Sequence, residues 1–364
     1  MDAKTFAEML GAEFFVGVPD SQLRAFCDCI VDTYGTDPMH HLIAANEGNA
    51  VAIAAGYHLA TKKIPVIYMQ NSGEGNIINP VESLTKIYAI PMIFVIGWRG
   101  EPGVKDEPQH LFQGQDTLAF LDVMGIEHFV LAGQTTETEL QGAMKNFRMA
   151  LDEGRSIAIV VRKNALTYAK KIDYRNKNAL TREEAIRHII AASGDDPIVS
   201  TTGKASRELF ELRAEHSHDF LTVGSMGHAS SIALGIALQK PEKKVWCIDG
   251  DGAMLMHMGA AAVIGTCGAK NLIHVVINNG AHESVGGFPT AGGNINLASI
   301  ARECGYARAI TVDNADDLDR ELASAKKFDG VVLLEIKCAI GSRKNLGRPT
   351  TTPLKNKNNF MSTM

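Results

Sequence analysis

The sequence lacks a long apolar run, an excess of positive charge and a dense set of cysteines. No segment approaches the run of about 20 apolar residues that crosses a bilayer. The net charge of −5 argues against a nucleic-acid-binding protein. The six cysteines match neither a disulfide framework nor a zinc site, and the N-terminus lacks the basic and apolar segments of a secretory signal. These absences predict a soluble, cytoplasmic globular protein.

Apolar runs alternate with helical patterns along the chain, which predicts an α/β fold of two doubly wound parallel-sheet domains. Between the two halves lies a polar stretch rich in Lys, Arg and Asn. We therefore predict a first domain over residues 1–168, a linker over 169–181 and a second domain over 182–364. Buried strands are expected at 14–18, 64–69, 92–96, 157–161, 197–199, 245–248, 273–277 and 331–336.

The most informative motif is Gly250-Asp251-Gly252, which residues 253–277 separate from the pair Asn278-Asn279. An apolar strand precedes each of these segments, and a helix is expected over 253–265. Such a right-handed crossover brings both segments to the carboxyl edge of a parallel sheet, where ligands bind. A carboxylate, an amide oxygen, a backbone carbonyl and a diphosphate would satisfy Mg²⁺. The triplet taken alone is also compatible with an ordinary turn.

The two segments together resemble the thiamine-diphosphate motif. The resemblance implies that Asp251 and Asn279 bind Mg²⁺ through their side chains and Ala281 through its carbonyl. In many relatives the second Asn lies one residue closer to the Asp, so Asn278 is an alternative ligand. The cofactor-binding segment then also includes Gly250, Gly252 and Ala253.

Glu47 is the acid at the opening of a helix of small residues. A glutamate in a first helical turn is often only a partner of the helix dipole. The run Asn46-Glu47-Gly48-Asn49-Ala50, however, resembles the activating-glutamate segment of thiamine-diphosphate enzymes. The resemblance implies that Glu47 hydrogen-bonds the cofactor's aminopyrimidine, with a pKa raised by an apolar pocket. It also implies active sites shared between two chains, hence at least a homodimer.

A third matching segment is Gly224-Ser225-Met226-Gly227-His228. The resemblance implies that Met226 supports the bent cofactor from below, although a core position would also suit a methionine. The Gly224 carbonyl would accept a hydrogen bond from the cofactor's amino group. His228 either contacts the diphosphate or caps the following helix.

Further segments resemble phosphonopyruvate decarboxylases, and the resemblance covers nearly the whole chain. It implies decarboxylation of 3-phosphonopyruvate to phosphonoacetaldehyde and CO₂ in phosphonate biosynthesis. Sulfopyruvate decarboxylation or a carboligation with the same cofactor are the alternatives. The short linker leaves no room for the central third domain of many related enzymes. The matching segments are 17–21, 68–73, 106–110, 225–230 and 341–349.

Asp20 and His110 are the candidate acid–base residues beside Glu47. Asp20 follows a strand and a Gly-Val-Pro turn, which places it at the carboxyl edge of the first sheet. His110 is expected in a polar loop, where a histidine with a pKa of about 6.5 suits proton delivery.

Four residues are candidate ligands of a dianionic substrate. Arginine forks with hydroxyl donors bind phosphonate well. Arg99 and Lys105 are expected in one strand-end loop and Arg343 in another, with Ser21 as a hydroxyl donor. The alternative for each cation is solvated surface charge.

Overall fold

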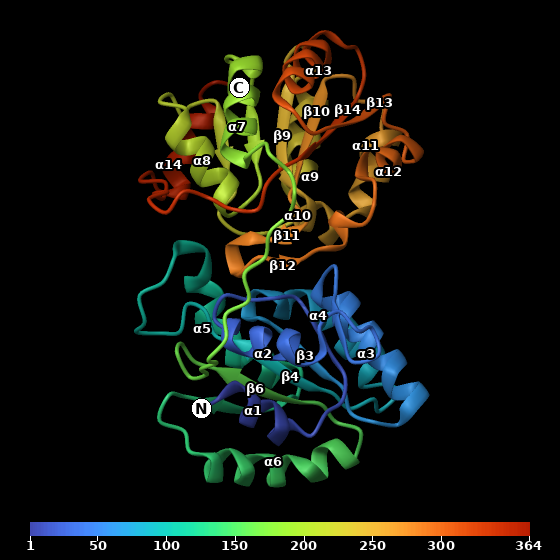
Figure 1. The fold of residues 1–364 in the computed structure, drawn as a ribbon, viewed down its shortest axis with the longest axis vertical. Helices are drawn as coiled ribbons and strands as arrows, with labels where there is room; N and C mark the ends of the chain where they lie inside the picture. The colour runs from blue at the N-terminus through green and yellow to red at the C-terminus, as the bar shows by residue number, and fades with distance from the viewer. The chain divides into compact units, whose positions relative to one another are not determined.

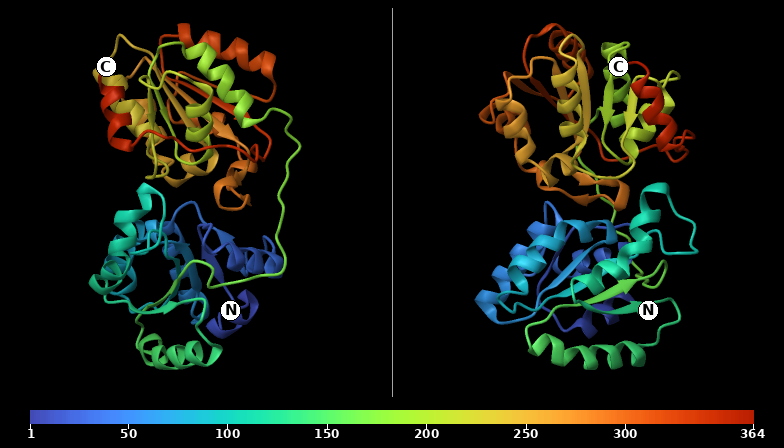
Figure 2. Two further views of the ribbon diagram at one scale, coloured as in Figure 1. Left: turned by 90° about the vertical axis from the view of Figure 1, so that its left-hand side faces the viewer. Right: turned by 180° about the vertical axis from the view of Figure 1, so that it is seen from behind.

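The computed structural model describes residues 1–364 and divides into two compact units, Met1–Asp173 and Tyr174–Met364 (Figure 1). Each unit contains a six-stranded sheet, parallel throughout, with helices on both faces. The predicted architecture of two doubly wound sheets is therefore confirmed. The point of division falls in an extended stretch without helix or strand, which Figure 2 shows from the side. None of the helices has the length and apolar character to cross a membrane.

In the first unit, helices cover both faces of the sheet (Figure 1). One face packs under α3 (Glu47–Thr61), α4 (Glu74–Pro80) and α5 (Pro108–Val123). On the other lie α1 (Ala3–Leu10), α2 (Arg24–Tyr34) and α6 (Glu137–Asp152), with Phe26 of α2 packing on Phe15 and Tyr68 of the strands. The strand order is β2 (His41–Ile43), β1 (Phe15–Gly17), β3 (Val66–Gln70), β4 (Ile93–Gly97), β6 (Ile157–Val161) and β5 (Glu127–Leu131).

The second unit repeats this plan with its own core. One apolar cluster joins the sheet to α7 (Arg182–Ser193), α8 (Lys204–Leu212) and α13 (Ala315–Lys327). A second cluster joins the opposite face to α9 (Ala229–Gln239), α11 (Gly259–Thr266) and α12 (Leu297–Glu303), while α14 (Pro353–Met361) packs beside β8. The strand order is β13 (Arg308–Val312), β14 (Val332–Lys337), β10 (Leu272–Asn278), β9 (Val245–Gly250), β7 (Ile198–Ser200) and β8 (Asp219–Leu221).

The single helix predicted over 253–265 is wrong. The structure has two helices there, α10 (Asp251–Met256) and α11, and His257 between them leaves the helical conformation with φ −133° and ψ 47°. Gly227 packs against this break, since a side chain at 227 would lie 2.7 Å from the His257 ring. The neighbouring turn therefore occupies the space beside the break.

Both sheets reverse their strand order near the middle, and ligands of doubly wound folds bind at this reversal, outside the carboxyl ends of the strands. In the first sheet the chain runs from β1 outward to β2 and then back to β3. In the second sheet it runs from β7 outward to β8 and then back to β9. The segments that follow β1, β3, β7 and β9 are therefore the positions at which a ligand is expected.

Candidate active site

Asp251 begins α10 directly after β9, and only 2% of the residue is exposed. The Thr290 hydroxyl and the backbone N–H groups of Asn279 and Gly252 donate to its carboxylate. Burial nevertheless raises the pKa of Asp251 to about 6, because these donors replace only part of the lost hydration. A side chain at Gly292 would lie 2.8 Å from Oδ2, so this approach requires glycine. A buried carboxylate of this kind is suited to a cation.

The two adjacent asparagines at the end of β10 have different partners. Asn278 uses both N–H groups and its oxygen within the unit, on Gly292, Glu335 and Gly280. Asn279 Nδ2 donates to a carboxylate at 2.9 Å, and its Oδ1 accepts one backbone N–H at 3.1 Å. An amide oxygen has two lone pairs. Asn279 therefore keeps a lone pair for a further ligand, and its backbone already lies against Asp251.

The third oxygen donor predicted for the metal, the carbonyl of Ala281, lies in β11 (Ala281–His282), which pairs with β12 (Phe288–Pro289). His282 packs against the glycine triplet, since a side chain at Gly252 would lie 3.0 Å from its Cε1. Burial lowers the pKa of His282 to about 4, so the imidazole is neutral at physiological pH.

A buried ion cluster lies beside Asn279, and the sequence reasoning missed it. Glu283 accepts from Asn279 Nδ2, from Lys204 Nζ at 2.8 Å and from Arg182 Nη1 at 2.6 Å. Lys204 follows β7 through the turn Thr201-Thr202-Gly203. The sequence does contain a signal for this turn. A predicted strand precedes Thr-Thr-Gly-Lys, which gives the same strand–turn–helix pattern as the Gly-Asp-Gly segment.

The predicted cofactor-supporting segment follows β8 and joins the same edge of the second sheet. The Thr202 hydroxyl donates to the carbonyl of Val223, one residue before Gly224, at 2.7 Å. Met226 is half-buried between Ser225 and Gly227, which both have left-handed φ values, 51° and 89°.

His228 occupies the cap position of α9 but makes no side-chain capping bond. Its Nδ1 lies 3.1 Å from Ser225 Oγ, and its exposed ring contacts the His257 ring with centroids 4.3 Å apart and planes tilted by 40°. The capping alternative is therefore not realised through the side chain.

In the first unit, Glu47 begins α3 with 4% of the residue exposed. Burial raises the pKa of its carboxyl, although Asn76 Nδ2 donates to Oε2 at 2.7 Å. A side chain at Gly73 would lie 2.7 Å from Oε1. Asn76 thus fixes Oε2, and Gly73, which has no side chain, leaves room beside Oε1.

Asp20 lies at the strand reversal of the first sheet and is fully buried. Gln70, the last residue of β3, donates to its Oδ1 at 2.6 Å, and the Gln22 N–H donates to Oδ2 at 2.9 Å. Burial raises the pKa of Asp20, while Gln70, the charge of Arg99 and backbone donors oppose the rise. Ser72 in turn donates to Gln70 Oε1 at 2.9 Å.

Arg99 follows β4 and is held rigidly by Asp106. Its Nε and Nη2 donate to the two oxygens of Asp106 at 2.7 and 2.5 Å, and Nη1 donates to Ser21 Oγ at 3.0 Å. Burial raises the pKa of Asp106, but the guanidinium and two backbone N–H groups outweigh burial and bring it well below the usual range. The structure therefore brings Ser21, Asp20 and Arg99 together at one edge of the sheet.

His110, Lys105 and Arg343 have different surroundings. His110 is in the first turn of α5 rather than in a loop, and its carbonyl packs against Gly100. Lys105 is exposed in the connection before α5. Arg343 belongs to the second unit, where Glu183 and Glu211 pair with it, so its charge is already balanced.

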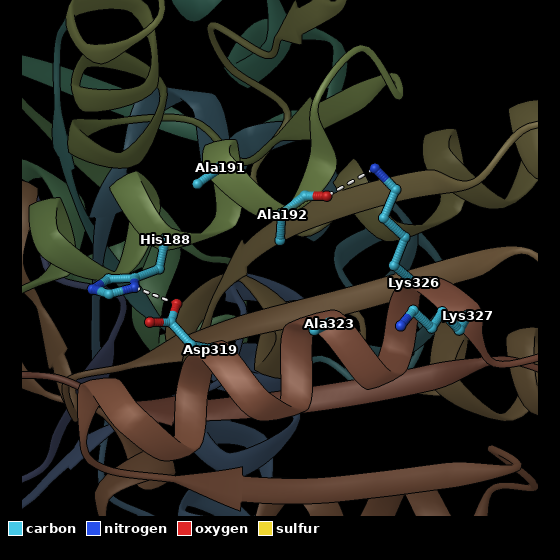
Figure 3. A pocket seen from close by; sticks show the side chains of 7 residues that line it. All are labelled: His188, Ala191, Ala192, Asp319, Ala323, Lys326 and Lys327. Carbon is cyan, nitrogen blue, oxygen red and sulfur yellow. Dashed lines mark hydrogen bonds and ion pairs between the residues drawn. The ribbon is translucent and has the colours of Figure 1, made fainter.

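A surface groove between α7 and α13 contains none of the predicted site residues (Figure 3). Its polar groups pair with one another or with the backbone, as between His188 and Asp319 at 2.5 Å. Its floor is made of alanines, so it offers no chemistry for catalysis. It is lined by His188, Ala191, Ala192, Asp319, Ala323, Lys326 and Lys327.

Comparison with known proteins assigns each unit to a domain type. Residues 3–124 match the thiamine pyrophosphate enzyme N-terminal TPP binding domain, and residues 201–336 match the C-terminal TPP binding domain. Phosphonopyruvate decarboxylase of Streptomyces viridochromogenes is 35% identical over 94% of this chain and 89% of that protein. The chain belongs to the phosphonopyruvate decarboxylase family. It is a thiamine-diphosphate-dependent carboxy-lyase by that membership.

Two other relatives show the range of this family. Phosphonopyruvate decarboxylase of Streptomyces hygroscopicus is 33% identical over 94% of this chain and 88% of that protein. Sulfopyruvate decarboxylase of Methanosarcina acetivorans is 30% identical over a smaller share of the sequences, 74% of this chain and 74% of that protein. The predicted family and its thiamine diphosphate cofactor are therefore confirmed.

Proposed function

We propose that the protein decarboxylates 3-phosphonopyruvate to phosphonoacetaldehyde and CO₂, a step of phosphonate biosynthesis, with thiamine diphosphate and Mg²⁺. The observation that carries this proposal is the similarity to two phosphonopyruvate decarboxylases over 94% of the chain, which extends through both units. The polar group of Ser21, Asp20 and Arg99 supports an anionic substrate.

Asp251, Asn279 Oδ1 and the Ala281 carbonyl are the proposed Mg²⁺ ligands. Their hard oxygens match the preference of Mg²⁺, which takes its remaining ligands from phosphate and water. Asp251 fits a cation because its carboxylate is buried with a pKa of about 6, and a nearby positive charge favours the ionised form. We prefer Asn279 to Asn278, because the backbone N–H of Asn279 donates to the Asp251 carboxylate and so places Asn279 directly beside it. Gly250, Gly252 and Ala253 are the proposed diphosphate neighbours.

Thiamine diphosphate, when bound, supplies the electron sink that decarboxylation of a 2-oxo acid requires. We propose that Glu47 exchanges a proton with the aminopyrimidine through Oε1, because Asn76 occupies Oε2. The raised pKa of Glu47 allows the carboxyl to hold a proton at a higher pH than an exposed glutamate does. Gly224 and Met226 are the proposed supports of the cofactor, with His228 at the diphosphate.

Asp20 is the proposed proton donor to the carbon that loses CO₂. Its raised pKa keeps the carboxyl protonated at a higher pH than an exposed aspartate. Gln70 and the Gln22 N–H fix the position of both oxygens, so little reorganisation is needed when the proton moves. His110 is the proposed second proton carrier.

Arg99 and Ser21 are the proposed phosphonate contacts. Asp106 fixes the guanidinium and leaves Nη1 directed at the Ser21 hydroxyl, so an arginine N–H and a hydroxyl lie 3.0 Å apart. This pair matches the donors that bind phosphonate oxygens. Lys105, exposed nearby in sequence, adds charge that attracts a dianion.

Steady-state assays with phosphonopyruvate, sulfopyruvate and pyruvate test the substrate. We expect the highest kcat/KM for phosphonopyruvate. Equal or better activity on pyruvate would overturn the substrate and leave the cofactor assignment standing. A preference for sulfopyruvate would establish the second candidate, which the relative from Methanosarcina acetivorans supports.

We also propose at least a homodimer with active sites shared between chains. A mixing experiment tests this directly, because Glu47→Gln and Asp251→Asn each remove one half of a site. An equimolar mixture that exchanges chains freely would recover about a quarter of wild-type activity if each site takes its halves from different chains, because half of its dimers are mixed and each mixed dimer has one intact site of two. A mixture as inactive as its parents would show that sites do not form between chains.

A further inference from the structure

Lys204 lies after β7, at the point where the strand order of the second sheet reverses. β7 pairs directly with β9, Ser200 opposite Ile248, so the turns that follow these strands are neighbours. One turn carries Asp251. The other passes through Gly203, which has a left-handed φ of 87°, and delivers Lys204 at the start of α8.

Lys204 retains hydrogen-bonding capacity at this position. Its Nζ donates to Glu283 at 2.8 Å, which uses one of the three N–H groups of an ammonium. About a quarter of the side chain is exposed, 24%, so the group is reachable. Arg182 differs, since it is 6% exposed and its Nε, Nη1 and Nη2 all donate to Glu208 or Glu283.

Glu283 joins this lysine to the proposed metal site. Its carboxylate accepts from Lys204, Arg182 and Asn279 Nδ2, so the ammonium and the proposed Mg²⁺ ligand Asn279 are held by one side chain. These three contacts fix the cluster, which presents the Lys204 ammonium at the crevice.

We propose that Lys204 binds the diphosphate of the cofactor from the β7 side of the crevice. The inference rests on the proposed function, which places the diphosphate beside Asp251. An ammonium that donates to a phosphate oxygen forms a charge-assisted hydrogen bond, which is stronger than a neutral one. The turn after β7 is therefore part of the cofactor site, with Lys204 as its charged contact.

Calorimetric titration of the apo protein with thiamine diphosphate in the presence of Mg²⁺ tests this proposal. Lys204→Met should weaken diphosphate binding about 10- to 100-fold, the range expected for one charge-assisted hydrogen bond, and should weaken thiamine binding much less. Lys204→Arg should recover part of the affinity. The matched control is Lys327→Met, an exposed lysine on α13, which should bind as the wild type does.

Two outcomes would overturn the proposal. One is unchanged diphosphate affinity in Lys204→Met, and the other is a raised KM for the 2-oxo acid with unchanged cofactor affinity. If Lys204→Met fails to fold because Glu283 loses a partner, Lys204→Gln keeps an N–H donor for Glu283, removes the charge and is held to the same expectation. A wild-type protein that does not bind thiamine diphosphate would instead refute the proposed function.

Discussion

Glu74 carries a buried carboxyl group whose removal should change how stability depends on pH. It begins α4, is 0% exposed, and neither carboxyl oxygen has a hydrogen-bond partner. Burial alone raises its pKa from 4.5 to about 9. The group is therefore protonated and uncharged in the folded protein at neutral pH.

The sign of the effect follows from proton binding. Above pH 4.5 the unfolded chain releases the Glu74 proton while the folded protein keeps it, so stability falls as pH rises from 4.5 to about 9. Below pH 4.5 Glu74 is protonated in both the folded and the unfolded state, so its titration no longer changes the free energy of unfolding. The slope is about 1.4 kcal/mol per pH unit, or about 4 kcal/mol between pH 5 and 8. Glu74→Gln keeps the shape and removes this titration.

Urea unfolding of the apo protein at pH 5, 6, 7 and 8 measures the difference. Trp98 is buried in the same unit as Glu74, and the chain has one other tryptophan, so a Trp246→Phe background makes fluorescence report that unit. The free energy of unfolding of Glu74→Gln should rise above that of the parent by about 1.4 kcal/mol per pH unit. Glu82→Gln, at an exposed glutamate, is the control and should run parallel to the parent. Parallel curves for Glu74→Gln as well would refute the reasoning.

The remaining predictions concern catalysis and metal binding. Glu47→Gln should still bind the cofactor but lose about 10²- to 10⁴-fold in kcat, since an amide cannot exchange the proton; wild-type turnover in steady-state assays would contradict its role. Asp251→Asn should abolish Mg²⁺-dependent cofactor binding in calorimetry, and retained Mg²⁺ affinity would exclude Asp251 as a ligand. Arg99→Lys should raise KM for phosphonopyruvate about 10-fold or more and leave KM for pyruvate unchanged, because lysine cannot keep the two-point contact with Asp106. With Asp20 as the acid, kcat should fall as pH rises through its raised pKa, and this fall should be absent from the residual activity of Asp20→Asn.

The strands that the sequence predicts are the internal strands of both sheets. Each of β1, β3, β4 and β6, and each of β7, β9, β10 and β14, has a neighbour on both sides. Such strands are covered on both faces, so they appear as continuous apolar runs. The four edge strands were missed. They carry polar residues among the apolar ones, as in Glu127-His128 of β5, and no run of apolar residues marks them.

The site residues also divide into those that a local sequence pattern identifies and those that it does not. Asp251 and Glu47 were identified from short local patterns, and both are buried with raised pKa values in the structure. Lys204 and Gln70 were not identified. The turn that carries Lys204 has a local signal, but its contact with Glu283, which is far along the chain, has none. Gln70 gains a role only through Asp20, which follows the neighbouring strand β1.

The sequence by itself determined the α/β class, the internal strands and the family with its cofactor, because each depends on residues close together in the chain. The tertiary structure decided which side chains share a strand edge. It placed the backbone of Asn279 against Asp251, balanced Arg343 with two glutamates, and joined Arg99 to Ser21. It also set the raised pKa values of Glu47, Glu74 and Asp251, since burial is a property of the packed unit and not of the local sequence.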